Sequence, residues 1–264
     1  MKEKKLWGNI NAVVALLVLL FMLVPIIVIF VNSFNSSQFF SFPPEGFTLK
    51  WYERFLENRE YKTAIAVSLK IATLSVLVAL LLGIPASYGI YRWKSPVSKV
   101  LSSLFLSPLM LPGIVWAIGL IQYYSIVNLT GTTAGLVAAH IILILPYVIR
   151  LVLSSLSYLD FDTVNAARTL GATSGKAFLK IVLPAIKPGV IISAIFGFMV
   201  SFNDVTISTF IAGTKNLTYP VRMYVELRTE GLDPLAVAVS AVIMAFTIVI
   251  ALLAEKFWSW SKYL

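Results

Sequence analysis

The sequence contains no cysteine and only one histidine, His140. Without cysteine the chain cannot build a disulfide framework, a thiolate zinc site or a thiol nucleophile. A single histidine cannot supply a multi-histidine metal site, so no resident metal and no other cofactor is expected. Charged residues are scarce as well, at 12% of the chain, against about 25% in soluble domains. These shortages exclude an ordinary water-soluble globule, a disordered chain and a nucleic-acid-binding domain.

What the sequence has instead is long apolar runs. Of its 264 residues 59% are hydrophobic, and the mean hydropathy is +0.89. A bilayer core about 30 Å thick needs roughly 20 helical residues to cross it. Six runs meet that length, at residues 10–31, 71–91, 100–122, 134–153, 189–213 and 235–254. We therefore expect an all-α integral membrane protein with six transmembrane helices, forming a single domain over residues 1–264.

The basic residues of the connecting segments predict the orientation of these spans. With the N-terminus inside, the cytoplasmic segments hold thirteen basic and four acidic residues, whereas the outer segments hold seven basic and eight acidic ones. Cytoplasmic loops of membrane proteins carry such an excess of lysine and arginine. Both termini are therefore expected in the cytoplasm. The first run is longer than a signal-peptide core and lacks a small-residue cleavage site, which predicts an uncleaved first span.

Proline interrupts four of the six apolar runs. The residues are Pro25, Pro85, Pro108, Pro112 and Pro146. Each lacks an amide donor and is expected to kink its helix, which lipid tolerates only where neighbouring groups satisfy the freed carbonyl. Such kinks occur in transporters and equally in the packing of other membrane proteins, so this pattern alone leaves both interpretations open.

The most patterned polar stretch is the connection at residues 154–188, between the fourth and fifth spans. Asp162 is a candidate N-cap for a short helix that ends at Gly171, because glycine fits the left-handed position after a helix. Thr173 is a candidate N-cap for a second short helix, which Pro184 is expected to stop. Two short helices that protrude from a membrane on the cytoplasmic side suit docking into a groove on another protein.

The same stretch resembles the EAA motif of the permease subunits of binding-protein-dependent ABC importers. The matching residues are Asn165-Ala166-Ala167, Gly171, and the run Ile181-Val182-Leu183-Pro184, all at the spacing of the motif. The resemblance implies a coupling helix that inserts into an ATPase subunit, formed by Asn165, Ala166, Ala167, Gly171, Leu183 and Pro184. Asn165 departs from the family, which usually has glutamate there, so the charge of that glutamate is missing.

Further segments resemble the spermidine/putrescine permease branch of these importers. They are Asn32-Ser33-Phe34-Asn35, Gly46-Phe47-Thr48 with Trp51-Tyr52, and residues 201–213. The resemblance implies a type I importer permease fold in a bacterial inner membrane. It also implies three kinds of partner besides membrane lipid: a second permease of similar fold, an ATPase dimer and an extracytoplasmic substrate-binding protein. The transported solute is then expected to be a polyamine or a related small cation.

No catalytic motif accompanies this resemblance. Residues 171–176 look like a phosphate-binding loop, but the spacing is one residue short and Ala177 follows the lysine, so the chain is not expected to bind ATP. No G-x-S-x-G or H-E-x-x-H sequence is present either. We therefore expect a non-catalytic subunit. The alternative is a self-sufficient secondary transporter or channel that uses Asp204 as an ion or substrate site.

Asp204 is the one carboxylate inside an apolar run. A charge within the bilayer is costly, so this side chain should face a wet cavity or a partner. With Asn203 and Phe202 it could line the substrate path and favour a cation. Asp204 could equally cap a broken helix that resumes at Thr206. His140 likewise has two interpretations, a packed interior residue or a proton relay.

Overall fold

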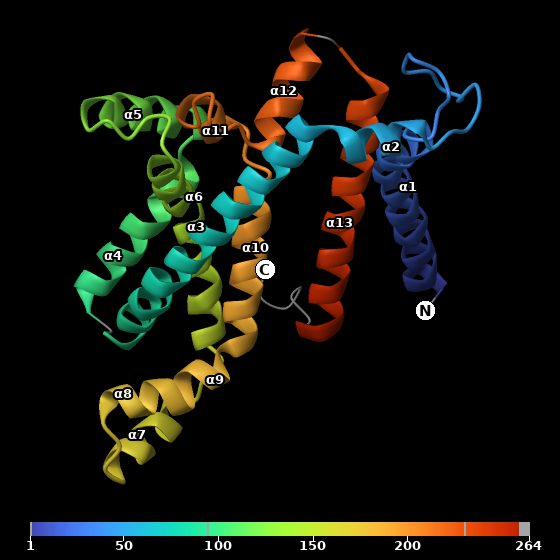
Figure 1. Cartoon of the computed structure of the whole chain (residues 1–264). Coiled ribbons are helices and arrows are strands. Elements are labelled where there is room, and N and C mark those ends of the chain that lie inside the picture. The colour runs from blue at the N-terminus through green and yellow to red at the C-terminus, as the bar shows by residue number, and fades with distance from the viewer. Residues whose placement is uncertain (1, 94, 230, 259–264) are drawn as a thin grey trace. The chain divides into compact units, whose positions relative to one another are not determined.

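The computed structural model describes residues 2–93, 95–229 and 231–258 (Figure 1). These residues are helical almost throughout, and their β-structure is limited to an isolated antiparallel bridge between Asn35 and Phe47. The long helices are α1 (Lys2–Asn32), α3 (Arg59–Arg92), α6 (Thr133–Leu156), α10 (Lys187–Phe202) and α13 (Pro234–Trp258). Shorter ones are α2 (Lys50–Glu57), α4 (Pro96–Leu106), α5 (Gly113–Ile126), α7 (Phe161–Thr169), α8 (Ser174–Ala177), α9 (Leu183–Ala185), α11 (Thr206–Ile211) and α12 (Tyr219–Thr229), with 3₁₀-helix η1 (Ser107–Met110) and π-helix η2 (Phe178–Val182).

Helices α1, α3, α6 and α13 are long and apolar enough to cross a membrane, and the expected all-α membrane fold is confirmed. Among the described residues the number of such spans rises to six if each of two bent helix pairs counts as one. One pair joins Pro96–Met110 to Gly113–Ile126 through a bend of 101°, and the other joins Ser174–Ala185 to Lys187–Phe202 through a bend of 69°.

The run at 100–122 is not one continuous helix, and its break lies beside Pro108 and Pro112, where kinks are expected. The chain leaves the helix at Leu111, which has extended backbone angles, and restarts after Pro112. Pro108 and Pro112 each lack an amide donor, so two helical hydrogen bonds one turn apart cannot form there. The break itself falls at Leu111 and Pro112.

The run at 189–213 is also broken. Helix α10 stops at Phe202, and α11 begins only at Thr206. At 1.5 Å per residue the 16 residues of α10 extend about 24 Å, less than the thickness of a bilayer core. Helix α10 alone is therefore too short to cross such a core. Irregular backbone that lies within a membrane must be satisfied within the protein or line a cavity.

The described chain divides into two compact units. The first comprises Met1–Glu60 and Val225–Phe246. Its connection between α1 and α2 is ordered by buried Asn35, whose side-chain oxygen accepts from the amides of Ser37 (3.1 Å) and Glu45 (3.2 Å). The carbonyl of Asn35 accepts from the indole of Trp51 at 2.8 Å. One asparagine therefore fixes a loop of more than ten residues.

The second unit comprises Tyr61–Tyr224 and Thr247–Leu264. Here α6 packs along α10, and α7 and α8 lie beyond the ends of both (Figure 1). A buried apolar cluster continues from α3 and α6 into the short helices through Val164, Ala177 and Val182. The short helices therefore have a core in common with the membrane helices.

At the other end of this unit the loop before α6 is joined to the loop after α11. The amide of Gly131 donates to the carbonyl of Ile211 at 2.9 Å, and the side-chain amide of Asn216 donates to the carbonyl of Gly131 at 2.8 Å. Gly213 has φ +61°, and a Cβ there would lie 2.9 Å from the Cα of Gly131. Glycine is required because the two backbones touch.

Candidate functional site

The first candidate site is the tip formed by α7 and α8. Helix α7 begins at Phe161, and its N-cap is Asp160, whose carboxylate accepts from the amide of Asp162 at 3.0 Å. The prediction of Asp162 as the cap was two residues late, because both aspartates suit the position and sequence does not say which adopts extended backbone angles. Asp162 instead lies in the first turn, where its charge favours the helix dipole.

The turn between α7 and α8 is as predicted. Gly171 has φ +94°, and the amide of Ala172 donates to the carbonyl of Ala167 at 3.0 Å. A Cβ at Gly171 would meet nothing within 4 Å, so conformation and not space requires glycine there. The hydroxyl of Thr173 accepts from the amide of Lys176 at 3.3 Å and caps α8, which confirms its predicted role.

Pro184 does not end the second short helix, contrary to the prediction. The helical backbone passes through η2 and α9 to Ala185, and the bend follows Ile186. The wider π-turn precedes the proline, which occupies an early position of α9, where a proline needs no amide donor. Leu183 is half-buried, and Pro184 is exposed.

The tip presents small and apolar side chains to the outside. Asn165, Ala166 and Gly171 are exposed, and Ala167 is half-buried. Leu170 is 89% exposed at the turn, and Leu179 is 60% exposed. Exposed leucines beside small residues suit a protein groove better than water.

Aromatic contacts fasten this tip to the end of α3. Tyr91 stacks on Phe161 with ring centroids 5.2 Å apart, and Tyr88 lies 4.9 Å from Phe178. These pairs connect the first turn of α7 and the π-turn to one membrane helix. Sequence reasoning missed them because the partners are about 70 to 90 residues apart, although two tyrosines three residues apart at the C-terminal end of an apolar helix were a usable signal.

The second candidate site is the break between α10 and α11, where Asp204 caps the second helix. One carboxylate oxygen accepts from the amide of Ser208 at 2.8 Å, and the other accepts from the amide of Ile207 at 3.4 Å. These two contacts are the ones expected if Asp204 caps a broken helix. An anion at a helix N-terminus satisfies amides that have no partner within the helix.

His140 of α6 completes this site. Its Nδ1 lies 2.7 Å from the hydroxyl of Ser201, and its Nε2 lies 3.0 Å from that of Ser208 and 3.8 Å from the Asp204 carboxylate. The side chain is 1% exposed. Both ring nitrogens are engaged, as the packed-residue interpretation requires. The sequence alone indicates no internal partner for Asp204, and this neighbour corrects that interpretation.

The other two residues predicted for the substrate path have different surroundings. Asn203 is exposed, and its amide donates to the carbonyl of Met199 at 2.8 Å. Phe202 is buried, and its ring stacks between Phe198 (5.7 Å) and Tyr219 (6.2 Å). The ring of Phe202 therefore does not face an open path within this chain, and its predicted contact with substrate has no support.

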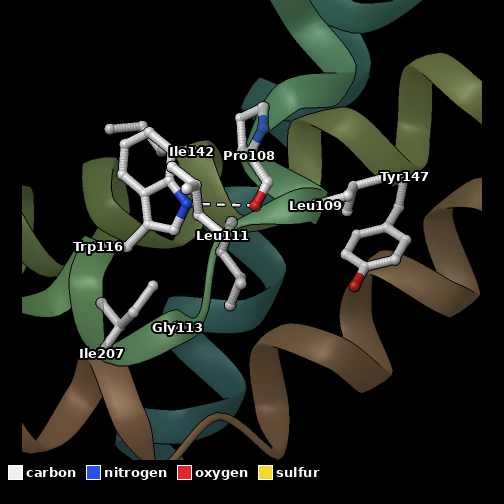
Figure 2. A pocket seen from close by; sticks show the side chains of 9 residues that line it. Pro108, Leu109, Leu111, Gly113, Trp116, Ile142, Tyr147 and Ile207 are labelled. Atoms are coloured by element: carbon white, nitrogen blue, oxygen red, sulfur yellow. Dashed lines mark hydrogen bonds between the residues drawn. The ribbon is translucent and has the colours of Figure 1, made fainter.

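A cavity of about 160 Å³ adjoins the break. It is lined by Pro108, Leu109, Leu111, Gly113, Trp116, Ile142, Leu143, Tyr147 and Ile207 (Figure 2). The indole of Trp116 donates to the carbonyl of Pro108 at 3.2 Å, which satisfies a carbonyl beside the bend. The walls are apolar and aromatic, without a carboxylate. In the described part of the chain no three His, Asp or Glu side chains gather in a way that could hold a metal.

Comparison with known proteins gives one family. The model of the binding-protein-dependent transport system inner membrane component matches residues 75–257. The spermidine/putrescine transport system permease protein PotC of Escherichia coli K12 is 30% identical over 235 residues, covering 89% of this chain and 88% of PotC. The putrescine transport system permease protein PotI of the same organism is 27% identical over 249 residues, covering 92% and 88%.

Solved structures give the same fold. A chain of a bacterial ABC transporter involved in the import of alginate superposes with a TM-score of 0.71 at 16% identity, covering 97% of this chain and 98% of that one. A chain of the MetNI methionine ABC transporter superposes with a TM-score of 0.59 at 16% identity, covering 73% and 92%. The type I importer permease fold predicted from the sequence is thereby confirmed.

Proposed function

We propose that this chain, which belongs to the family of binding-protein-dependent transport system inner membrane components, forms half of the translocation path of an importer for polyamines or a related small cation. The tip of α7 and α8 carries the proposal. Its caps, its left-handed glycine and its exposed leucines make a rigid protrusion with an apolar end. A subunit with no ATP-binding motif of its own needs such a contact to receive energy from another chain.

The tip is proposed to dock into an ATPase subunit through Asn165, Ala166, Ala167 and Gly171. Small side chains allow close approach of the helix, and Leu170 supplies apolar area at its end. Leu183 and Pro184 lie where the second helix turns towards α10, so they are proposed to position the tip. ATP hydrolysis is assigned to the partner, and this chain transmits movement only.

The choice of solute rests on the relatives and on the broken helix. PotC and PotI carry spermidine and putrescine in their names. Asn203 offers an exposed amide at the break, and the Asp204 carboxylate next to it keeps 9% of its side chain accessible. A carboxylate there attracts cations to the path even while it caps α11. Phe202 is left out of the path because it is buried.

The remaining partners follow from the same assignment. A second permease of similar fold would complete the path, an ATPase dimer would bind the two tips, and an extracytoplasmic binding protein would deliver the solute. Both termini are proposed to lie in the cytoplasm, on the side where the basic residues gather. If each bent pair counts as one span, residues 154–188 are proposed to lie on that same side.

The test is ATP hydrolysis by the complete complex in lipid nanodiscs. Binding protein loaded with spermidine or putrescine is expected to stimulate hydrolysis above the level with empty binding protein. The matched controls are binding proteins loaded with an amino acid or with ferric iron. Stimulation by one of these, and not by polyamine, would overturn the proposed solute and leave the family assignment intact.

A further inference from the structure

An open hollow of about 740 Å³ lies at the start of α4, with a surface that is more apolar than polar. One of its walls is Tyr91, whose ring also stacks on Phe161 of the tip. Its polar wall is α4 itself, through Ser95, Ser98, Lys99, Ser102 and Ser103. Residues three, four and seven positions after Ser95 share one helix face, so three of the serines and the lysine form a continuous stripe.

The opposite face of α4 is apolar and open. Val97 is 59% exposed, Val100 is 66% exposed and Leu104 is 63% exposed. This face suits lipid chains. The stripe of hydroxyls with an ammonium group does not suit lipid chains, because polar groups in a membrane helix need partners.

The stripe keeps free donors. Ser98 is buried, and its hydroxyl donates to the carbonyl of Ser95 at 3.1 Å. Ser102 and Ser103 have no hydrogen bond to the described part of the chain other than those of their helix backbone, and Lys99 has no carboxylate within ion-pair distance in that part. No acidic residue lines the hollow. The donors and the positive charge together select an anion.

The other walls are partly apolar. Ile90 and Tyr91 come from the end of α3, and Leu153 comes from α6. An apolar wall beside a cationic, hydroxyl-rich one fits an amphiphile, whose head meets the donors while a chain lies along the wall. A path for polyamines is disfavoured, because Lys99 would repel them.

The length of the polar stripe is compatible with a lipid headgroup. From Ser95 to Ser103 the helix rises about 12 Å, which covers a headgroup layer of about 6 Å and the edge of the hydrocarbon. Trp93, 70% exposed, precedes the helix, and tryptophan is enriched at membrane interfaces.

We propose that this hollow binds the phosphate of an anionic phospholipid of the cytoplasmic leaflet. Lys99 neutralises the phosphate, Ser102 and Ser103 donate to its oxygens, and an acyl chain lies along Ile90 and Leu153. The leaflet rests on the proposed orientation, whereas the lipid chemistry rests on the hollow alone. Basic pockets between membrane helices on the cytoplasmic side bind such headgroups elsewhere.

The test is lipid retention by the assembled complex, measured by native mass spectrometry after release from nanodiscs of phosphatidylcholine and phosphatidylglycerol. Wild type is expected to retain phosphatidylglycerol selectively. Lys99→Gln should lower that retention about fivefold, and Ser102→Leu should lower it by filling the hollow. Lys256→Gln, which removes an exposed lysine elsewhere, should leave retention unchanged.

Two results would overturn the proposal. One is equal retention by Lys99→Gln and Lys256→Gln, which would make the lipid a nonspecific annulus. The other is displacement of phosphatidylglycerol by millimolar inorganic phosphate, with the complex then binding phosphate and no lipid selectively. That result would make the hollow a site for a soluble anion. Neither result depends on which solute the complex transports. Failure of the polyamine proposal would therefore show in the ATP-hydrolysis test and not in lipid retention.

Discussion

Gly171 adopts left-handed backbone angles that most side chains disfavour. Its φ of +94° costs a residue with a Cβ about 1–2 kcal/mol, and more when the Cβ is branched. We expect Gly171→Val to reduce ATP-coupled uptake at least fivefold, because about 1–2 kcal/mol corresponds to about five- to thirty-fold in population. The measurement is ATP-coupled solute uptake into proteoliposomes by the wild-type and valine complexes.

Asparagine supplies the control at this position. Gly171→Asn tolerates left-handed angles, and a Cβ there meets open space. It should keep most of the uptake. Wild-type uptake by the valine variant would contradict the assignment of this turn as the coupling tip.

Asp204 caps α11 and is proposed to lie beside the translocation path, and two substitutions separate these roles. Asp204→Asn keeps a good cap, whereas Asp204→Ala loses it at a cost of about 0.5–2 kcal/mol. We expect Asp204→Asn to assemble normally but to take up polyamine more slowly, because the charge beside the path is gone. Asp204→Ala should also lower the thermal midpoint. Unchanged polyamine uptake by a well-assembled Asp204→Asn complex would leave Asp204 as a cap alone.

At the scale of elements, the aromatic contacts between α3 and the short helices decide how firmly the tip is held. Phe178→Ala removes the ring 4.9 Å from Tyr88, and aromatic pairs contribute about 0.5–1.5 kcal/mol beyond their buried area. We expect faster amide hydrogen exchange in α7 and weaker coupling of uptake to hydrolysis. Leu179→Ala, at the exposed neighbouring position, should leave the exchange of α7 unchanged. Equal exchange in both variants would show that the rings do not hold the tip.

The docking face of α7 gives a separate test. Ala167 is half-buried, and a large side chain there would hold the helix away from a groove. We expect Ala167→Trp to lose ATPase copurification and uptake, whereas Ala167→Ser retains both. Full uptake with tryptophan at this position would reject the proposed docking face.

Local chemistry made the tip predictable from sequence. Caps, a glycine and a stripe of apolar residues act within a few positions of one another, so the roles of Thr173 and Gly171 follow from the residues next to them. The choice between Asp160 and Asp162 depends on a backbone conformation that either residue permits. The prolines at 108 and 112 predicted a kink, but the bend angle depends on the extended backbone of Leu111 between the two helices.

The contacts of the broken helix could not be predicted in this way. His140 meets Ser201 and Ser208 across 61 and 68 residues of sequence. Nothing in the sequence near His140 marks those partners, since a buried histidine in an apolar helix pairs with whatever the packing of α6 on α10 brings to it. The capping role of Asp204 was one of two open alternatives for the same reason.

At the scale of the whole molecule, the chain exposes more apolar surface than one subunit can cover. The apolar stretch of α1, Asn11–Asn32, buries none of its most apolar window within the chain, and Leu170 and Leu179 are exposed at the tip. We expect the chain to purify stably only with its second permease and ATPase. Liposomes holding this subunit alone should show no solute uptake, and substrate-dependent uptake by them would favour the self-sufficient transporter.

Helix α11 is fastened at both of its ends to the same neighbour. Asp204 and His140 hold its first turn to α6, and the contact of Gly131 with Gly213 and Asn216 holds its last turn to the loop that starts α6. A six-residue helix clamped twice has no freedom to slide or rotate on its own. The last turn of α10 is joined to the same helix, since the hydroxyl of Ser201 lies 2.7 Å from His140, so we expect α11, α6 and the end of α10 to move as one piece during transport.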